Sequence, residues 1–96
     1  MTRVVVCSAA EGEYTHSLRW YADRSPAAAD AFDNEFDRAL SEISANPSRF
    51  PHCDSEHQFY LMKRYPFRII YRVGESEVLI IAVAHTSRDP EYWKGR

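Results

Sequence analysis

The stretch FRIIYRVGESEVLIIAVA, residues 67–84, decides the fold. Residues of opposite character alternate from Phe67 to Val73, which is typical of a strand that buries one face. The polar segment 74–77, which begins with Gly74, predicts a turn. The run from Val78 to Ala84 is apolar throughout, which predicts a second and more deeply buried strand. Together these segments predict two antiparallel neighbours in a sheet.

Two further strands are predicted before this hairpin in the chain. Residues 58–63 have strand composition and precede a turn marked by Pro66, so they extend the hairpin into a three-stranded meander. Residues 3–7, with three consecutive valines, predict a buried strand at the N-terminus. The sequence does not say where this first strand lies in the sheet.

Two helices are predicted between the first strand and the meander. Ser8 and Glu11 have the spacing of a capping box, and the helix that they open runs to about Asp23. Its apolar positions are Ala10, Tyr14, Leu18, Tyr21 and Ala22. Ser25 and Pro26 form an N-cap and first helical residue, and Asn46-Pro47 ends this second helix. Its apolar stripe is Ala29, Phe32, Phe36, Ala39, Leu40 and Ile43.

These elements predict an α+β fold in which a helix hairpin packs on one face of a small, mainly antiparallel sheet. A chain of 96 residues with 45% apolar residues has material for one modest core, so we expect a single domain over residues 1–96. The longest apolar run is too short to span a membrane, and no signal peptide is evident, which favours a cytoplasmic protein.

Composition argues against several kinds of site. The two cysteines form no disulfide framework, and the three glycines do not cluster into a phosphate-binding loop. His52, Cys53 and His57 are metal-ligand types, but no further ligand pair lies near them. We therefore expect neither a metal nor a cofactor. Residues 1–57 carry five Lys/Arg and ten Asp/Glu, whereas residues 58–96 carry seven and four, an excess too small for avid nucleic-acid binding.

The polar residues that follow the last strand are the main candidates for a site. The strand ends in His85, and Arg88 and a Tyr92-Trp93 pair follow within eight residues. Polar groups at the end of a buried strand are held rigidly and still reach solvent, as binding sites require. The alternative is structural: the strand ends, and a tryptophan pins the C-terminal turn.

The ordered set of elements and residues resembles the RelE/ParE superfamily of bacterial toxins from type II toxin-antitoxin systems. The matching stretches are 18–21, Phe36, Ala39, Leu40, Ile43, 46–51, 65–73 and 81–93. The tail, with a histidine, an arginine and Pro-x-Tyr-Trp, is most similar to the ParE-like plasmid-stabilisation branch. The resemblance implies a toxin that a small antitoxin neutralises, with DNA gyrase as its target.

The resemblance leaves a second function open, because RelE-like relatives cleave messenger RNA on the ribosome. A metal-independent ribonuclease needs a base, an acid and a cation beside the phosphate. The candidates here are His85 for proton transfer, Arg68 and Arg88 for the phosphate, and Tyr71 for the ribose or base. A third possibility is a non-toxic family member that is retained as a partner of its antitoxin.

If the toxin acts instead by binding a protein, other residues are expected to matter. Tyr92, Trp93 and Arg96 are of the types that carry most interface energy, so they are the candidates for target binding. Trp20 and Tyr21, on the first helix, are the candidates for antitoxin binding. The acidic balance of the chain favours this protein-binding hypothesis over RNA cleavage.

Overall fold

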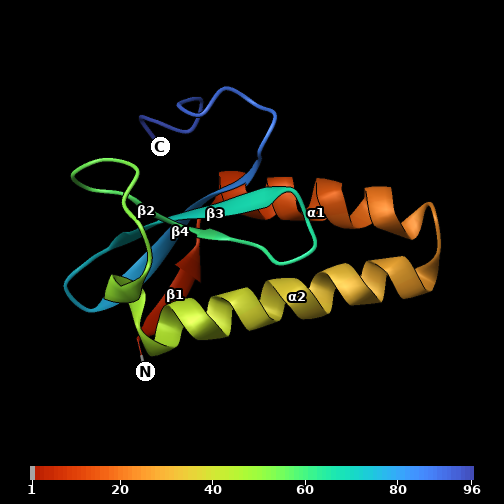
Figure 1. The fold of residues 1–96 in the computed structure, drawn as a ribbon, viewed down its shortest axis with the longest axis horizontal. Coiled ribbons are helices and arrows are strands. Elements are labelled where there is room, and N and C mark those ends of the chain that lie inside the picture. Colours follow the sequence, from red (N-terminus) through yellow and green to blue (C-terminus); the bar gives the residue numbers. More distant parts are fainter. Residues whose placement is uncertain (1) are drawn as a thin grey trace.

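The computed structural model describes residues 2–96 and confirms the predicted α+β architecture (Figure 1). Within these residues the elements are β1 (Arg3–Val6), α1 (Ser8–Ala22), α2 (Pro26–Ala45), the 3-10 turn η1 (Pro47–Arg49), β2 (Gln58–Leu61), β3 (Phe67–Val73) and β4 (Glu77–His85). The helices form a hairpin, and the three strands that follow form the predicted meander.

The sheet has the strand order β1-β4-β3-β2, which places the first strand at an edge. β1 runs parallel to β4, while β3 is antiparallel to both β2 and β4. β1 pairs only with the first part of β4, from Glu77 to Ile80. The second half of β4, from Ile81 onward, therefore has no strand neighbour on that side.

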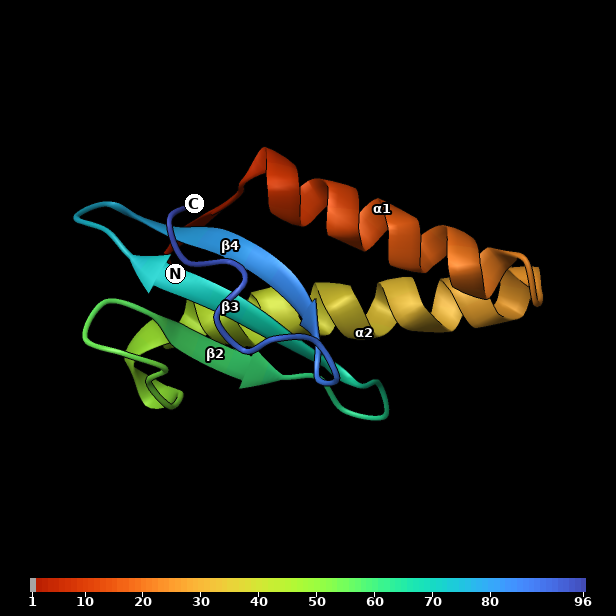
Figure 2. The same cartoon turned by 90° about the horizontal axis from the view of Figure 1, so that it is seen from above.

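The main core lies between the helices and one face of the sheet. Figure 2 shows α2 crossing this face, whereas α1 lies beside β4. The stripe predicted on α2 is buried: Phe32, Ala39 and Ile43 are inaccessible to solvent, and Phe36 is 5% exposed. From the sheet, the residues that complete this core are Tyr60, Phe67, Ile69, Tyr71, Val78, Ile80 and Val83.

A smaller core lies on the other face of the sheet, under the C-terminal tail, residues 86–96 (Figures 1 and 2). Trp93 is 2% exposed and packs with Ile70, Ile81, Ala82 and Ala84. A bulge makes this possible, because Ile70 pairs with Ala82 while Tyr71 pairs with Ile80. Ile81 and Ala82 therefore both belong to the tail side. The tryptophan pins the tail, as the structural alternative from the sequence proposed.

The helix ends confirm one predicted cap and correct another. The Ser25 hydroxyl accepts a 3.0 Å hydrogen bond from the Ala28 amide at the start of α2, as expected. The capping box at Ser8 is wrong: Cys7 is the N-cap, and the Glu11 amide donates to the Cys7 carbonyl. Ser8 is already helical, so its side chain does not cap. Ala22, expected on the apolar face of α1, is exposed.

Within residues 2–96, neither helix combines the length and the apolar character that crossing a membrane demands.

Candidate functional site

A groove of about 630 Å³ separates α1 from the end of β4. One wall is a single face of α1 that includes Trp20 and Tyr21, and the opposite wall includes Phe67, Val83 and His85. Its other lining residues are Ala9, Gly12, Glu13, His16, Ser17, Pro66 and Arg88. The structure therefore brings the predicted antitoxin-binding pair and the residues of the strand end into one concave surface.

Trp20 and Tyr21 differ in how far they are available to a partner. Trp20 is 48% exposed, and the Arg24 guanidinium lies 3.1 Å from its ring centroid. Tyr21 is partly buried, because it stacks on Phe32 with 4.9 Å between ring centroids. Trp20 can thus contact a partner directly, whereas Tyr21 supports it with an edge-on contact of 4.9 Å.

The free edge of β4 above this groove is completed by two side chains instead of a strand. The Val83 amide donates a 3.0 Å hydrogen bond to Oε1 of Glu13. Two residues earlier, the Ile81 carbonyl accepts a 3.1 Å hydrogen bond from Nη1 of Arg96. A carboxylate and a guanidinium thus take the places of the carbonyl and amide of a neighbouring strand, which satisfies two backbone groups.

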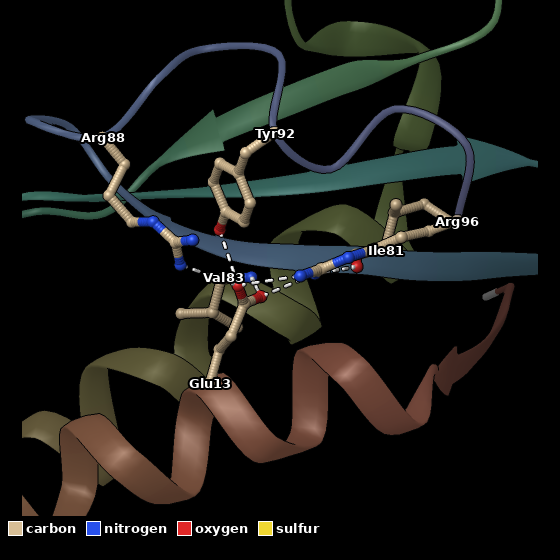
Figure 3. A network of polar contacts seen from close by, with 6 residues as sticks. All are labelled: Glu13, Ile81, Val83, Arg88, Tyr92 and Arg96. Carbon is tan, nitrogen blue, oxygen red and sulfur yellow. Dashed lines mark hydrogen bonds and ion pairs between the residues drawn. The ribbon is translucent and has the colours of Figure 1, made fainter.

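Glu13 is the centre of this arrangement, as Figure 3 shows. Its side chain is 14% exposed and joins α1 to β4 and to the tail. Arg96 donates to both carboxylate oxygens, at 2.9 and 3.2 Å, and the Tyr92 hydroxyl donates at 2.7 Å. Arg88 makes a longer contact of 3.4 Å and stacks on the Tyr92 ring, 3.6 Å from its centroid.

These contacts change the acidity of both groups. Burial raises the pKa of Glu13, but the hydrogen bonds from Arg96, Tyr92 and the Val83 amide, with the charge of Arg96, outweigh it. The pKa of Glu13 therefore lies below its ordinary value, and the side chain is a carboxylate at neutral pH. Burial and the hydrogen bond to Glu13 raise the pKa of Tyr92 to about 12, so its hydroxyl keeps its proton and donates.

No pattern in the sequence marks Glu13 as a functional residue. Its partners lie 70 to 83 residues away along the chain, so no local spacing points to them. The one signal in the sequence is the position of Glu13 on α1. It lies between the apolar positions Ala10 and Tyr14 and one turn before the buried Ser17, so it is at the border of the buried face of the helix. An acid at such a position requires a partner in the fold.

Three of the four nuclease candidates line one cavity at the end of β4. His85, Arg68 and Arg88 line a cavity of about 370 Å³ beneath the tail. Nδ1 of His85 is occupied by Ser87, whose amide lies 3.1 Å away and whose hydroxyl lies 2.6 Å away. The guanidinium of Arg68 lies over the Phe59 ring at 5.4 Å, and its Nε is buried without a hydrogen-bond partner among the described atoms.

The fourth nuclease candidate, Tyr71, lies apart from these three. It is 0% exposed, and its side chain belongs to the core between the sheet and the helices. Its hydroxyl donates to the Pro47 carbonyl and accepts from Gln58 at 3.3 Å. Burial raises the pKa of Tyr71 to about 12. The ring holds η1 against β3 and is not accessible to a ribose or a base.

The target-binding candidates of the tail are engaged within the domain. Trp93 lies in the smaller core, with the His57 ring 4.8 Å away. Tyr92 and Arg96 are bound to Glu13. His57 itself lies 3.0 Å from Asp54. Hydrogen bonds from the Glu56 amide and from His57 lower the pKa of Asp54 to about 2. Contact between a target and the ring of Trp93 requires movement of the tail.

The matching family model defines this chain as a toxin of a toxin-antitoxin system. The chain belongs to the family of ParE toxins of type II toxin-antitoxin systems (parDE), whose family model matches residues 4–90. A solved structure described as the chromosomal ParDE TA system from P. aeruginosa has the same fold, with a TM-score of 0.76. The two chains are 13% identical, and the match covers 88% of this chain and 96% of that one. No curated protein matches the chain significantly.

Proposed function

We propose that this toxin acts by binding a protein, DNA gyrase, and that a small antitoxin neutralises it in the cytoplasm. Family membership over residues 4–90 supports the toxin assignment. The observation that favours protein binding over RNA cleavage is the engagement of the cations. Arg96 is bound to Glu13 and Arg88 makes a longer contact with the same carboxylate, so part of their positive charge is neutralised within the domain.

The groove between α1 and β4 is the proposed antitoxin site. Its lining is mainly apolar, and Trp20 offers a half-exposed aromatic anchor of the type that dominates interfaces. The edge of β4 adds backbone groups. The Phe67 carbonyl accepts a hydrogen bond from the Met62 amide, which lies on the β2 side of β3. Because Phe67 turns its backbone groups toward β2, its partner His85 turns its own amide and carbonyl away from β3, toward the free edge of β4. An antitoxin segment that fills the groove can therefore accept a hydrogen bond from the His85 amide, whereas Glu13 occupies the Val83 amide and the His85 carbonyl accepts from the Arg88 amide.

A metal-independent mRNA endonuclease is the second candidate, because His85, Arg68 and Arg88 line one cavity. An imidazole beside two guanidiniums is a minimal set for proton transfer and phosphate binding. Tyr71 is not part of this set, and the tail covers the cavity. This candidate predicts that His85→Ala abolishes toxicity, whereas gyrase binding predicts that the variant stays toxic.

Induced expression in cells distinguishes the candidates. Gyrase inhibition stops incorporation of labelled thymidine first, whereas mRNA cleavage stops incorporation of labelled methionine first. A supercoiling assay with purified gyrase is the direct check, and full supercoiling activity at a large excess of toxin would refute the proposed target. Normal growth combined with tight antitoxin binding would identify the non-toxic family member.

Antitoxin binding is tested separately with the product of the adjacent small gene. Trp20→Ala is expected to weaken the complex by about tenfold or more, since an anchor residue contributes at least about 1.4 kcal/mol. Arg19→Ala, an exposed neighbour outside the groove, is the matched control. Equal affinities for the two variants would place the antitoxin elsewhere.

A further inference from the structure

The C-terminal tail is attached to the domain by side chains and not by its backbone. Within residues 2–96, its backbone hydrogen bonds to the body lie near its start, from the Thr86 amide to the Pro66 carbonyl and from the Arg88 amide to the His85 carbonyl. In the segment 87–96, the backbone–backbone hydrogen bonds are local turns, such as Tyr92 to Asp89 and Arg96 to Trp93. The tail has no helix or strand of its own. Its position therefore depends on a few side-chain contacts.

Those contacts form two fastenings of different kinds. The first is apolar: Trp93 inserts between the tail and the sheet, against Ile81 and Ala82. The second is the cluster around Glu13, which Figure 3 shows gripping the tail through Arg88, Tyr92 and Arg96. All three contacts from the tail to α1 converge on one carboxylate. Removal of that single charge therefore weakens the contacts of all three tail residues at once, and the hydrogen bond from Arg96 to the Ile81 carbonyl remains.

The tail bridges a hollow and is not packed solidly on the sheet. The cavity of about 370 Å³ lies beneath it, with Arg68 and His85 among the lining residues on the sheet side and Trp93 and Lys94 among those on the tail side. The contacts that hold the tail down are therefore concentrated at Trp93 and at Glu13. The helix hairpin contributes to the other core, so lifting the tail leaves that core intact.

We propose that the tail is a strap that Glu13 fastens over the sheet. When the contacts of Glu13 are lost, the strap lifts as a unit and uncovers the apolar face of Ile70, Ile81 and Ala82 beside Arg68, while the domain stays folded. Glu13 is thus a positioning residue, because it acts through Arg88, Tyr92 and Arg96. Since Glu13 also lines the groove on its α1 side, the fastening lies within reach of any segment seated there.

The accessibility of Trp93 to a soluble quencher tests this proposal. In a Trp20→Phe background, Trp93 is the only tryptophan of the chain. Glu13→Gln keeps the shape of the side chain and removes its charge. In this variant we expect the acrylamide quenching constant of Trp93 to rise about threefold or more, because local opening of the tail exposes its ring to the quencher. Glu11→Gln, an exposed glutamate two residues earlier on α1, is the matched control and should leave quenching unchanged.

Two further measurements separate strap opening from general destabilisation. Amide hydrogen exchange of α2 should be unchanged in Glu13→Gln, because its core is not part of the strap. Tyr92→Phe, which deletes one of the donors to Glu13, should raise quenching in the same direction but less. Unchanged quenching in Glu13→Gln would overturn the proposal. Faster exchange across α2, by the same factor as the increase in quenching, would also overturn it.

Discussion

Phe36 provides the sharpest test of how the helix hairpin packs on the sheet. Its side chain is 5% exposed, and its ring centroid lies 4.5 Å from that of Tyr14 on α1. It belongs to the main core, with Ala39 and Ile43 on the next turns of α2. Truncation to alanine removes the ring from between the two helices and leaves a cavity beside Tyr14.

The expected loss of stability follows from the buried area. An aromatic side chain buries roughly 150–250 Å², which at about 25 cal/mol per Å² gives roughly 4–6 kcal/mol as an upper bound. Measured truncations of buried phenylalanine cost about 3–5 kcal/mol, and we expect Phe36→Ala to fall in that range. Since a domain of this size has about 5–15 kcal/mol in total, the variant is expected to be marginally stable.

Urea unfolding followed by circular dichroism measures the effect. For a domain of this size, a loss of about 3 kcal/mol lowers Tm by roughly 12–24 °C. Phe36→Leu, which keeps most of the apolar volume, should cost less than about 1.5 kcal/mol. Asn34→Ala, at an exposed position on the same helix, is the control and should stay within about 0.5 kcal/mol of the parent. If Phe36→Ala melted as Asn34→Ala does, the packing described for α2 would be refuted.

Three other outcomes follow from the contacts. Ser25→Ala removes the cap on Ala28 and should cost about 1 kcal/mol in urea unfolding, whereas Ser41→Ala, exposed in mid-helix, should cost much less. Trp93→Ala should cost about 3 kcal/mol by the same measurement, and a loss below about 1 kcal/mol would mean that the smaller core is not formed in solution. The pKa of Glu13 is lowered in the fold, so its contribution to stability is full above the ordinary value of 4.5 and disappears as the pH falls through the lowered pKa. The difference in unfolding free energy between parent and Glu13→Gln should therefore shrink as the pH is lowered from 6 to below that pKa, and a difference independent of pH would contradict the assignment.

The sequence by itself determined the elements and their faces. Period-two alternation located β3, the apolar run located β4, and the stripe through Phe32 and Phe36 gave α2 its correct phase. Ser25 and Pro26 marked the start of α2 correctly, because a cap is a local interaction. These features depend on neighbours within a few residues, which a sequence pattern records directly. The family resemblance, confirmed over residues 4–90, rests on the same ordered elements.

Only the tertiary structure decided what lies next to what. The place of β1 beside β4 depends on the pairing of residues more than 70 positions apart, which no local pattern encodes. Glu13 and Arg96 are 83 positions apart, so no local pattern indicates the contact between them that holds the tail. Tyr71 shows the opposite error, because the sequence made it a candidate site residue and the structure buries it completely. Burial and long-range electrostatics arise from the whole fold, so they became visible only when the sheet, the helices and the tail were placed together.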